Sequence, residues 1–306
     1  MDLVVRSPRI PVSGETILGG DFLMVPGGKG ANQAVAMAKL GAHAIFVARV
    51  GDDVFGHKSL ENFQKENVDT RYVTLTPGTP SGVALITVDA AGNNAIVVAP
   101  GANAKLSPED VSRAQSEICS AGAVVAQLEV PLETVQCAAE LAHHAGVTFL
   151  LNPAPAQPLA PALLRMVTVL TPNEVEAEIL TGVQVTDPES ACAAADRLLD
   201  LGCQAAIVTM GAKGSLLAQG TMREHLAAEI VNVVDTTAAG DAFTGSLAVG
   251  VAQGRSLVDS AVLANRAAAL SVTKMGAQPS MPTMKEVCAF IPTRRHVSRR
   301  IRGTDL

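Results

Sequence analysis

Residues 123–153 read AVVAQLEVPLETVQCAAELAHHAGVTFLLNP and decide the fold class. An apolar run at 123–127 precedes a helical stretch at 132–145, and a second apolar run at 147–151 ends at Asn152-Pro153. Continuous apolar runs separated by helices are typical of parallel strands that are buried on both faces. The segment therefore predicts a βαβ unit with a right-handed crossover.

The same alternation continues toward the C-terminus. Short β-rich runs occupy 167–170 and 205–210, with a helical stretch at 189–201 between them. A helix at 30–40 and a strand at 45–50 fit the same layer pattern. We therefore expect one three-layer α/β/α domain that covers residues 1–292.

Part of the first hundred residues behaves differently. Strand-like runs occur at 3–5, 17–25, 81–88 and 94–99, and the last two are joined by the turn sequence DAAGN at 89–93. We expect these runs, within about 3–26 and 81–99, to form a small separate β-sheet that projects from the main layers.

Charge is distributed unevenly along the 306 residues, of which 48% are hydrophobic and 17% are charged, with a net charge of -6. Five arginines and one aspartate lie in residues 293–306, so the body alone has a net charge near -10. An acidic body argues against nucleic acid as a partner. We expect the basic tail, 293–306, to be solvated and disordered.

Cysteine usage and hydropathy indicate the compartment. The five cysteines include no CxxC pair, so reduced thiols are expected rather than a disulfide framework or a zinc site. No apolar run approaches the roughly 18 residues of a membrane span, and the first residues do not read as a signal peptide. We expect a cytoplasmic protein with no membrane partner.

The strongest candidate site is DTTAAGD at 235–241, between a strand-like run at 229–234 and a helical stretch. Small residues at a helix start let backbone N–H groups approach an anion, and the helix dipole favours negative charge there. A carboxylate in such a site would repel a phosphate, so Asp241 is better used as the base that takes a proton from an attacking hydroxyl. The alternative is that Asp241 only caps the helix.

Three weaker sites lie in loops. GGKGANQ at 27–33 is neither a Walker loop nor a dinucleotide fingerprint, but its turn, ammonium group and amide suit a polyol. TPNEVE at 171–176 could position Mg²⁺-bound water or simply begin a helix. TMGAKG at 209–214 is a glycine-bounded turn that could hold a nucleotide. The stretches at 171–176 and 209–214 follow predicted strands, and open α/β sheets bind their ligands at such strand ends.

Six stretches in this order and spacing resemble the ribokinase-like (PfkB) carbohydrate kinases. They are residues 27–34 (GGKGANQA), 127–129 (QLE), 152–155 (NPAP), 171–174 (TPNE), 235–241 (DTTAAGD) and 276–280 (GAQPS). The resemblance runs from Asp2 to about Pro292. It implies ATP-dependent phosphorylation of a sugar, with D-ribose phosphorylated on its 5-hydroxyl to give ribose 5-phosphate and ADP. It also implies that the small sheet at about 3–26 and 81–99 is a lid that closes over the sugar. Mg²⁺, K⁺ and a homodimer formed through this lid are implied as well.

The resemblance assigns roles to residues of this sequence. The residue implied to be catalytic is Asp241. The residues implied to bind the sugar are Asp2, Gly28, Lys29, Asn32, Glu129 and Asp241. The residues implied to bind ATP are Asn173, Thr209, Gly211, Ala212, Lys213, Gly214, Ala239, Gly240 and Asn265. The residues implied for a monovalent cation are Asp235, Thr237, Ser271, Lys274, Gly276 and Ser280, with Glu176 associated with Mg²⁺. Lys274 would act through its backbone carbonyl, because an ammonium group cannot ligate a cation.

Two departures from the family pattern matter. The usual Gly-Ala-Gly-Asp is Ala238-Ala239-Gly240-Asp241 here, which is tolerable if φ of Ala238 is negative. Family members also carry a strand and an asparagine before the position of Asp2. We therefore expect a form that is extended upstream to be more stable and to have a lower KM for the sugar.

Three alternative functions remain open. The first is a related kinase that acts on deoxyribose, a nucleoside or a sugar acid. The second is a non-catalytic protein that binds a sugar or a nucleotide. The third, a nicotinamide dehydrogenase, is argued against by the missing fingerprint and by the presence of Asp241.

Overall fold

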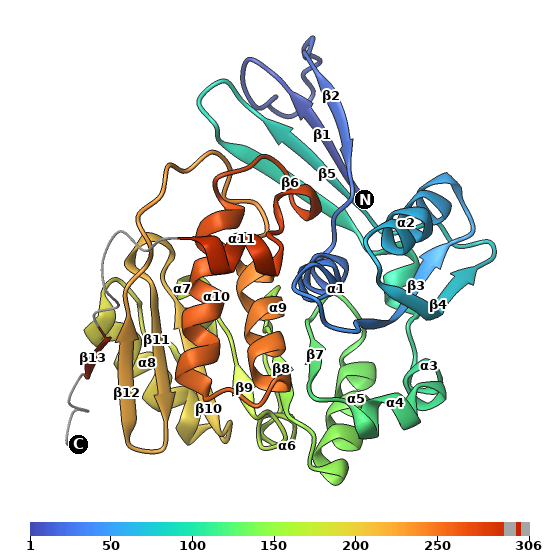
Figure 1. The fold of residues 1–306 in the computed structure, drawn as a ribbon. Helices are drawn as coiled ribbons and strands as arrows, with labels where there is room; N and C mark the ends of the chain where they lie inside the picture. Colours follow the sequence, from blue (N-terminus) through green and yellow to red (C-terminus); the bar gives the residue numbers. More distant parts are fainter. Residues whose placement is uncertain (291–297, 301–306) are drawn as a thin grey trace.

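A seven-stranded sheet forms the centre of the computed structural model, which describes residues 1–290 and 298–300 (Figure 1). Neighbouring strands from β7 to β10 are parallel, and the later strands are antiparallel. In sheet order the strands are β13 (Ser298–Arg300), β12 (Met222–Leu226), β11 (Ser215–Gln219), β10 (Ala205–Thr209), β9 (Val169–Leu170), β8 (Phe149–Leu151) and β7 (Val124–Ala126).

Strand β10 shows how the three layers arise. Ala205 and Ile207 pack on one face of the sheet, and Ala206 and Val208 pack on the other, so the first four residues of this strand are buried. The first face is covered by α9 (Ala239–Ala252) and α10 (Leu257–Ser271). The second face is covered by α3 (Pro108–Arg113), α4 (Gln115–Ser120), α5 (Leu132–Ala145), α6 (Pro161–Leu164), α7 (Glu174–Thr181) and α8 (Pro188–Asp200). The predicted α/β/α architecture is confirmed.

Two predicted strands are wrong or too long. Residues 229–234 form no strand, although their composition is β-rich. A β-rich run needs a free strand edge, and the outer edge of β12 is already paired with β13. The run predicted at 17–25 is a strand only at β2 (Phe22–Val25).

The lid sheet is a separate four-stranded sheet with the order β2-β1-β5-β6. Its other strands are β1 (Asp2–Arg6), β5 (Val83–Val88) and β6 (Asn94–Ala99), and it projects from the top of the main body in Figure 1. The predicted turn at 89–93 closes the β5–β6 hairpin, with hydrogen bonds from Asn93 and Ala91 to the carboxylate of Asp89.

Strand β3 (Ile45–Gly51) differs from expectation, because it does not join the main sheet. It pairs only with β4 (Asp69–Thr76), in parallel, and α2 (Val54–Lys65) connects the two. Side chains hold this small sheet to the main body. The guanidinium group of Arg49 donates to both carboxylate oxygens of Asp110 on α3.

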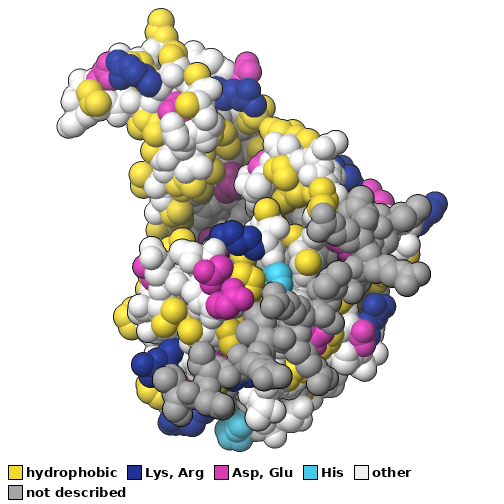
Figure 2. Space-filling view, turned by 90° about the vertical axis from the view of Figure 1, so that its left-hand side faces the viewer, with side chains coloured by type: hydrophobic (Ala, Val, Ile, Leu, Met, Phe, Trp, Pro, Cys, Tyr) yellow, Lys and Arg dark blue, Asp and Glu magenta, His cyan; other side chains and the backbone are white. Residues whose placement is uncertain are grey.

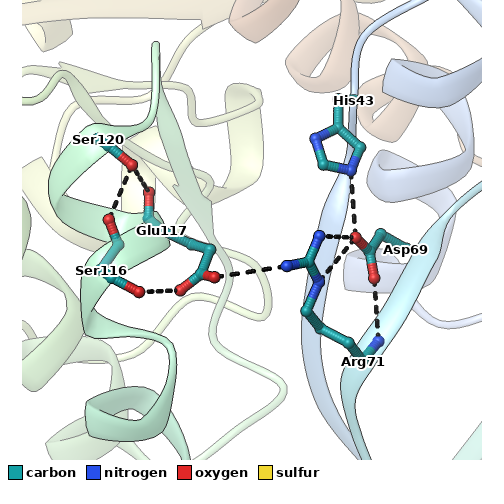
Figure 3. Close-up of polar contacts among 6 residues, drawn as sticks. All are labelled: His43, Asp69, Arg71, Ser116, Glu117 and Ser120. Atoms are coloured by element: carbon teal, nitrogen blue, oxygen red, sulfur yellow. Dashed lines mark hydrogen bonds and ion pairs between the residues drawn. The ribbon is translucent and has the colours of Figure 1, made fainter.

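A second polar bridge is drawn in Figure 3. Arg71 on β4 donates to Asp69, and its other nitrogen lies 3.6 Å from a carboxylate oxygen of Glu117 on α4. The ring of His43 lies 3.1 Å from the same aspartate. The contact between Arg71 and Glu117 links the β3–β4 sheet to α4, while Asp69 and His43 hold Arg71 from within the small sheet.

The remaining helices are α1 (Lys29–Lys39) and α11 (Met284–Ala289). Three residues of the basic tail form β13, where we expected disorder, and residues 293–297 and 301–306 lie outside the described part of the chain. Within the described ranges, no helix has the length and apolar character that crossing a membrane requires.

Candidate active site

Asp241 lies in the first turn of α9 and is only 5% exposed. The amide of Asn32 donates to one of its carboxylate oxygens at 2.8 Å, and the amide of Gln33 donates to the other at 3.1 Å. Both amides belong to α1, so two helix N-termini that are far apart in sequence meet at this carboxylate. The sequence pattern predicted both segments, and the structure brings them together.

Glycine makes this close approach possible. A Cβ at Gly245 on α9 would lie 2.9 Å from the carbonyl oxygen of Gln33 and 2.9 Å from the Cβ of Ala36. Real Cβ atoms do not tolerate such contacts without a shift of the backbone. The small residue therefore sets the spacing between α1 and α9 that lets side chains of α1 reach Asp241.

Burial raises the pKa of Asp241 to about 6. The charge of Lys29 and the hydrogen bonds from Asn32 and Gln33 act in the opposite direction, because they favour the ionised form. At neutral pH the group is therefore a carboxylate whose proton affinity is higher than that of an ordinary aspartate. This combination suits a general base.

Asn32 also presents an unused acceptor. Its Nδ2 is bound to Asp241, while its Oδ1 is buried and has no partner in the described structure. A buried acceptor without a donor is costly unless a ligand or water supplies the hydrogen. The site therefore offers a hydroxyl-bearing ligand an acceptor immediately beside the base.

The residues implied for the sugar gather at the start of α1. Gly28 has φ of 94°, and the carboxylate of Asp2 occupies the space that a Cβ of Gly27 would fill. The backbone N–H of Lys29 donates to Glu129 at 2.9 Å. Two carboxylates, one ammonium group and the acceptor of Asn32 thus line one small region, which suits a polyol with several hydroxyls.

Further side chains that the sequence reasoning left without a role hold the base in place. Gln33 is 0% exposed and also donates to Asn152 at the end of β8. Gln127, after β7, donates to the carbonyl oxygen of the Gln33 side chain. Asn152 was read only as the end of a strand, and Gln33 only as part of a loop. The signal available was that both occur in stretches resembling the family.

The first turn of α9 is suited to an anion. Among the described residues, its N-cap has no side-chain hydrogen bond. The N–H of Ala239 donates to the carbonyl of Thr236 at 3.3 Å, which leaves the N–H of Gly240 available for an anion. A Cβ placed on Gly240 would meet nothing within 4 Å, which means that the space beside it is open. We expected a negative φ at Ala238, and this expectation is wrong, because its φ is +58°. The helix start imposes this left-handed geometry, and the methyl group makes it strained.

The turn at 209–214 follows β10, as predicted. Thr209 donates its N–H to the carbonyl of Pro172, and Gly211 has φ of 52°, beginning a 3₁₀ turn through Ala212 and Lys213. Gly214 has φ of 91°, and a Cβ there would overlap backbone atoms of residues 226–228.

Asn265 on α10 reaches the same area. It donates to the carbonyl of Leu226 at 3.4 Å and accepts from Ser215 at 3.3 Å. The implied nucleotide residues on β10, the turn and α10 are thus gathered at one place.

Asn173 and Glu176 form a reciprocal cap at the start of α7. The N–H of Glu176 donates to Asn173 at 2.8 Å, and the N–H of Asn173 donates to Glu176 at 2.9 Å. Burial raises the pKa of Glu176, and the charges of Lys29 and Asp241 act on it as well. The carboxylate thus faces the same region as the base, although one of its oxygens serves the helix. Within the described ranges, no cluster of three His, Cys, Asp or Glu side chains could hold a metal by itself.

The residues implied for a monovalent cation are brought together in part. Asp235 accepts from the N–H and the hydroxyl of Thr237 and from the N–H of Gly276. Burial opposes ionisation of Asp235, but these hydrogen bonds prevail and lower its pKa. The loop before α9 and the segment after α10 are therefore tied to each other.

The other implied cation residues make local contacts. The hydroxyls of Ser271 and Ser280 donate to carbonyls of their own turns, Ala268 and Ala277. The ammonium group of Lys274 pairs with Glu286 at 2.6 Å. That pairing turns its charge away and leaves only its backbone for a cation.

Comparisons with known proteins identify the family to which this chain belongs. A model of the pfkB family of carbohydrate kinases matches residues 1–284. The chain is similar to ribokinase of Haemophilus influenzae (40% identity; 95% of each chain) and to deoxyribokinase of Salmonella typhi (42% identity; 95% of each chain). Its structure is similar to that of Arabidopsis thaliana ribokinase complexed with ribose and ATP, with a TM-score of 0.87, 34% identity and 94% of each chain covered. The chain therefore belongs to the pfkB family of carbohydrate kinases.

Proposed function

We propose that this chain transfers the terminal phosphoryl group of ATP to the 5-hydroxyl of D-ribose, giving ribose 5-phosphate and ADP. The observation that carries the proposal is the buried carboxylate of Asp241, which lies beside the unused acceptor of Asn32 and at the uncapped start of α9. The relatives named ribokinase, and the related structure with ribose and ATP, support the choice of substrates.

Each part of the site has a role in this reaction. Asp2, Glu129 and the Oδ1 of Asn32 accept hydrogen bonds from sugar hydroxyls. Asp241 takes the proton of the attacking hydroxyl while a bond forms between that oxygen and phosphorus and the bond to ADP breaks. The N–H group of Gly240, in the first turn beside Ala239, donates to the negative oxygens of the transferring group. The turn at 209–214, with Asn173 and Asn265, holds the nucleotide.

Two cations complete the proposal. Mg²⁺, when bound, would neutralise charge on the phosphates, and Glu176 would hold it through bound water with its remaining carboxylate oxygen. A K⁺ ion would take oxygen ligands from Asp235, Thr237, Ser271, Lys274, Gly276 and Ser280, several of them through backbone carbonyls. A cation there would fix the loop that precedes the anion site.

The lid sheet is the proposed dimer contact. Its strands expose Phe22, Ile96, Val97 and neighbouring apolar side chains, with 66% exposure at Val97. In Figure 2, hydrophobic side chains gather on the projecting upper part of the molecule. Exposed apolar patches of this kind mark interaction surfaces. We also propose that residues 1–292 act as one kinase domain in the cytoplasm, where the five free thiols would remain reduced.

A sugar panel tests the proposed function. ADP release is measured with ATP and, in turn, D-ribose, 2-deoxy-D-ribose, a nucleoside and a sugar acid, each with the Asp241→Asn variant as the control for contaminating kinases. We expect the highest kcat/KM with D-ribose. A higher value with 2-deoxy-D-ribose would reassign the substrate, and no turnover with any sugar would refute the kinase proposal.

A further inference from the structure

An amide network connects the ends of three neighbouring strands to Asp241. It consists of the side chains of Gln33 on α1, Gln127 after β7 and Asn152 after β8, together with the carbonyl of Thr171 after β9. The backbone N–H groups of Asn152 and Thr171 each donate, at 2.9 Å, to the last carbonyl of the neighbouring strand, β7 and β8 respectively. The backbone pairing of the sheet therefore continues past the strands and holds the network in place.

The carbonyl oxygen of Thr171 fixes the direction of every amide in this network. It can only accept, so Asn152 turns its NH₂ group toward it, at 2.9 Å, and its own Oδ1 toward Gln33. Gln33 must then present its NH₂ group, which donates to Asn152 at 3.2 Å and to Oδ1 of Asp241 at 3.1 Å. The Oε1 of Gln33 faces the other way and accepts from the amide of Gln127. The direction of the Gln33 amide is therefore fixed by groups other than Asp241.

Asn32 donates to the other carboxylate oxygen under a different constraint. Its Nδ2 lies 2.8 Å from Oδ2 of Asp241, and its buried Oδ1 has no partner among the described residues. A half-turn of this amide about its last bond exchanges a donor for an acceptor at Oδ2. The two oxygens of the base therefore differ, because Oδ1 meets a fixed donor and Oδ2 meets a donor that can become an acceptor.

We infer that the amide network fixes Gln33 as a donor to Oδ1 and thereby makes Oδ2 the atom of Asp241 that takes a proton. A proton on Oδ1 would meet the NH₂ group of Gln33, whereas a proton on Oδ2 is accepted by Asn32 after its half-turn. Gln33, Gln127 and Asn152 are therefore positioning residues.

The catalytic use of this difference rests on the proposed function. The O–H bond of the attacking hydroxyl breaks, its proton joins Oδ2 of Asp241, and the electron pair stays on the oxygen that bonds to phosphorus. A sugar hydroxyl bound to Asn32 permits the half-turn of that amide, because a hydroxyl can both donate and accept.

Charged groups face Asp241 from several elements. Burial raises the pKa of Asp241, Lys29 at the start of α1 lowers it, and Glu129, which follows β7, raises it. Glu176 on α7 interacts with Asp241 as well. A charge acts across space on the whole carboxylate, whereas a hydrogen bond acts on one oxygen. These charges therefore change the pKa of Asp241 but do not distinguish Oδ1 from Oδ2.

The first test compares two substitutions on the same helix, Gln33→Leu and Asn32→Leu. The pKa of Asp241 is followed through its carboxyl carbon by ¹³C NMR of the full chain without ligands, and Asp241→Asn identifies the signal. Gln33→Leu should raise this pKa by about one unit, because it removes a donor that serves only the ionised form. Asn32→Leu should raise it by less than half as much, because Asn32 serves both the ionised and the protonated forms. Equal rises, or a larger rise in Asn32→Leu, would overturn the inference.

The second test measures whether Gln127 acts through Gln33. Gln127→Met removes the donor to Oε1 of Gln33 without adding charge, so the amide is held less firmly and the pKa of Asp241 should rise by about half a unit. The same change in the Gln33→Leu background should leave the pKa unchanged, since the amide on which it acts is gone. Thr134→Val is the control, because it also removes a buried hydrogen bond, to the carbonyl of Leu106, that lies outside the amide network. It should not change the pKa of Asp241.

The outcomes distinguish a fixed amide from a general loss of structure. An unchanged pKa in Gln127→Met, an equal rise in both backgrounds, or a rise of the same size in Thr134→Val would overturn the inference. Gln127 is only partly buried, so Gln127→Met alone carries the test if Gln33→Leu does not fold.

The titrations also separate this inference from the proposed function. They use no substrate, so the expected shifts in pKa would stand even if no sugar were phosphorylated, and the ADP-release assay alone would then refute the kinase proposal. Normal turnover of ribose without the expected shifts would overturn the role of the amide network and leave the kinase proposal intact.

Discussion

Replacing Asp241 with Asn should remove activity and increase stability at the same time. The change keeps the size of the side chain but removes its ability to accept a proton, so kcat should fall by about 10²–10⁴ while ATP and ribose still bind. Asn32 has a free Oδ1, so a flip of its amide can receive the new NH₂ group.

The stability gain follows from the pKa of Asp241. Its pKa in the folded protein is about 6, compared with 3.8 for an ordinary aspartate. The folded state therefore binds the proton more tightly, and the native protein loses stability as the pH rises from about 4 to about 6. Two pKa units correspond to about 3 kcal/mol of unfolding free energy at neutral pH. The Asn variant does not ionise at this position, so its free energy of unfolding does not decrease in this way as the pH rises.

Urea unfolding at about pH 4 and about pH 7.5, with ADP release as the activity assay, checks both effects. We expect the variant to be more stable than the parent by up to about 3 kcal/mol at the higher pH and nearly equal to it at the lower pH. Asp187→Asn is the matched control, because Asp187 caps α8 at an exposed site and Asn caps a helix nearly as well. A variant that keeps more than about a tenth of the parent kcat would refute the role of Asp241 as a base.

Three further predictions concern the surroundings of the base. The rate should fall as the pH drops through about 6, where Asp241 becomes protonated. Gln33→Leu should shift this fall in rate to higher pH, because it removes a hydrogen bond that favours the carboxylate. A purely structural loss would instead lower the rate at every pH. Ala238→Gly should raise the free energy of unfolding by about 0.5–1 kcal/mol, because it removes the strain of a methyl group at a φ of +58°. Ala239→Gly, at the first residue of α9, should lower the free energy of unfolding. Equal effects of the two changes in urea unfolding would contradict this reasoning. Activity should be higher with K⁺ than with a large organic cation, and Asp235→Asn should reduce that difference; equal rates with both cations would count against the cation site.

The sequence was sufficient for the layered core. Runs such as 205–208 and 149–151 are apolar throughout, and a short run of this kind is typical of a strand buried on both faces, so the α/β/α layers could be predicted from local composition. The turn at 89–93 and the start of α9 were likewise encoded in a few neighbouring residues. Local chemistry fixes these features because their hydrogen bonds and packing depend on residues that are close in sequence.

Only the tertiary structure decided how distant segments meet. Whether residues 229–234 form a strand depends on whether a sheet edge is free for pairing. Whether β3 and β4 form a sheet of their own depends on which strand edges lie next to each other in the folded chain. The contact of Gln33 with Asp241 spans more than two hundred residues and requires the close packing of α1 on α9 at Gly245. Likewise, the raised pKa of Asp241 comes from burial, which is a property of the assembled layers and not of the residues beside it in sequence.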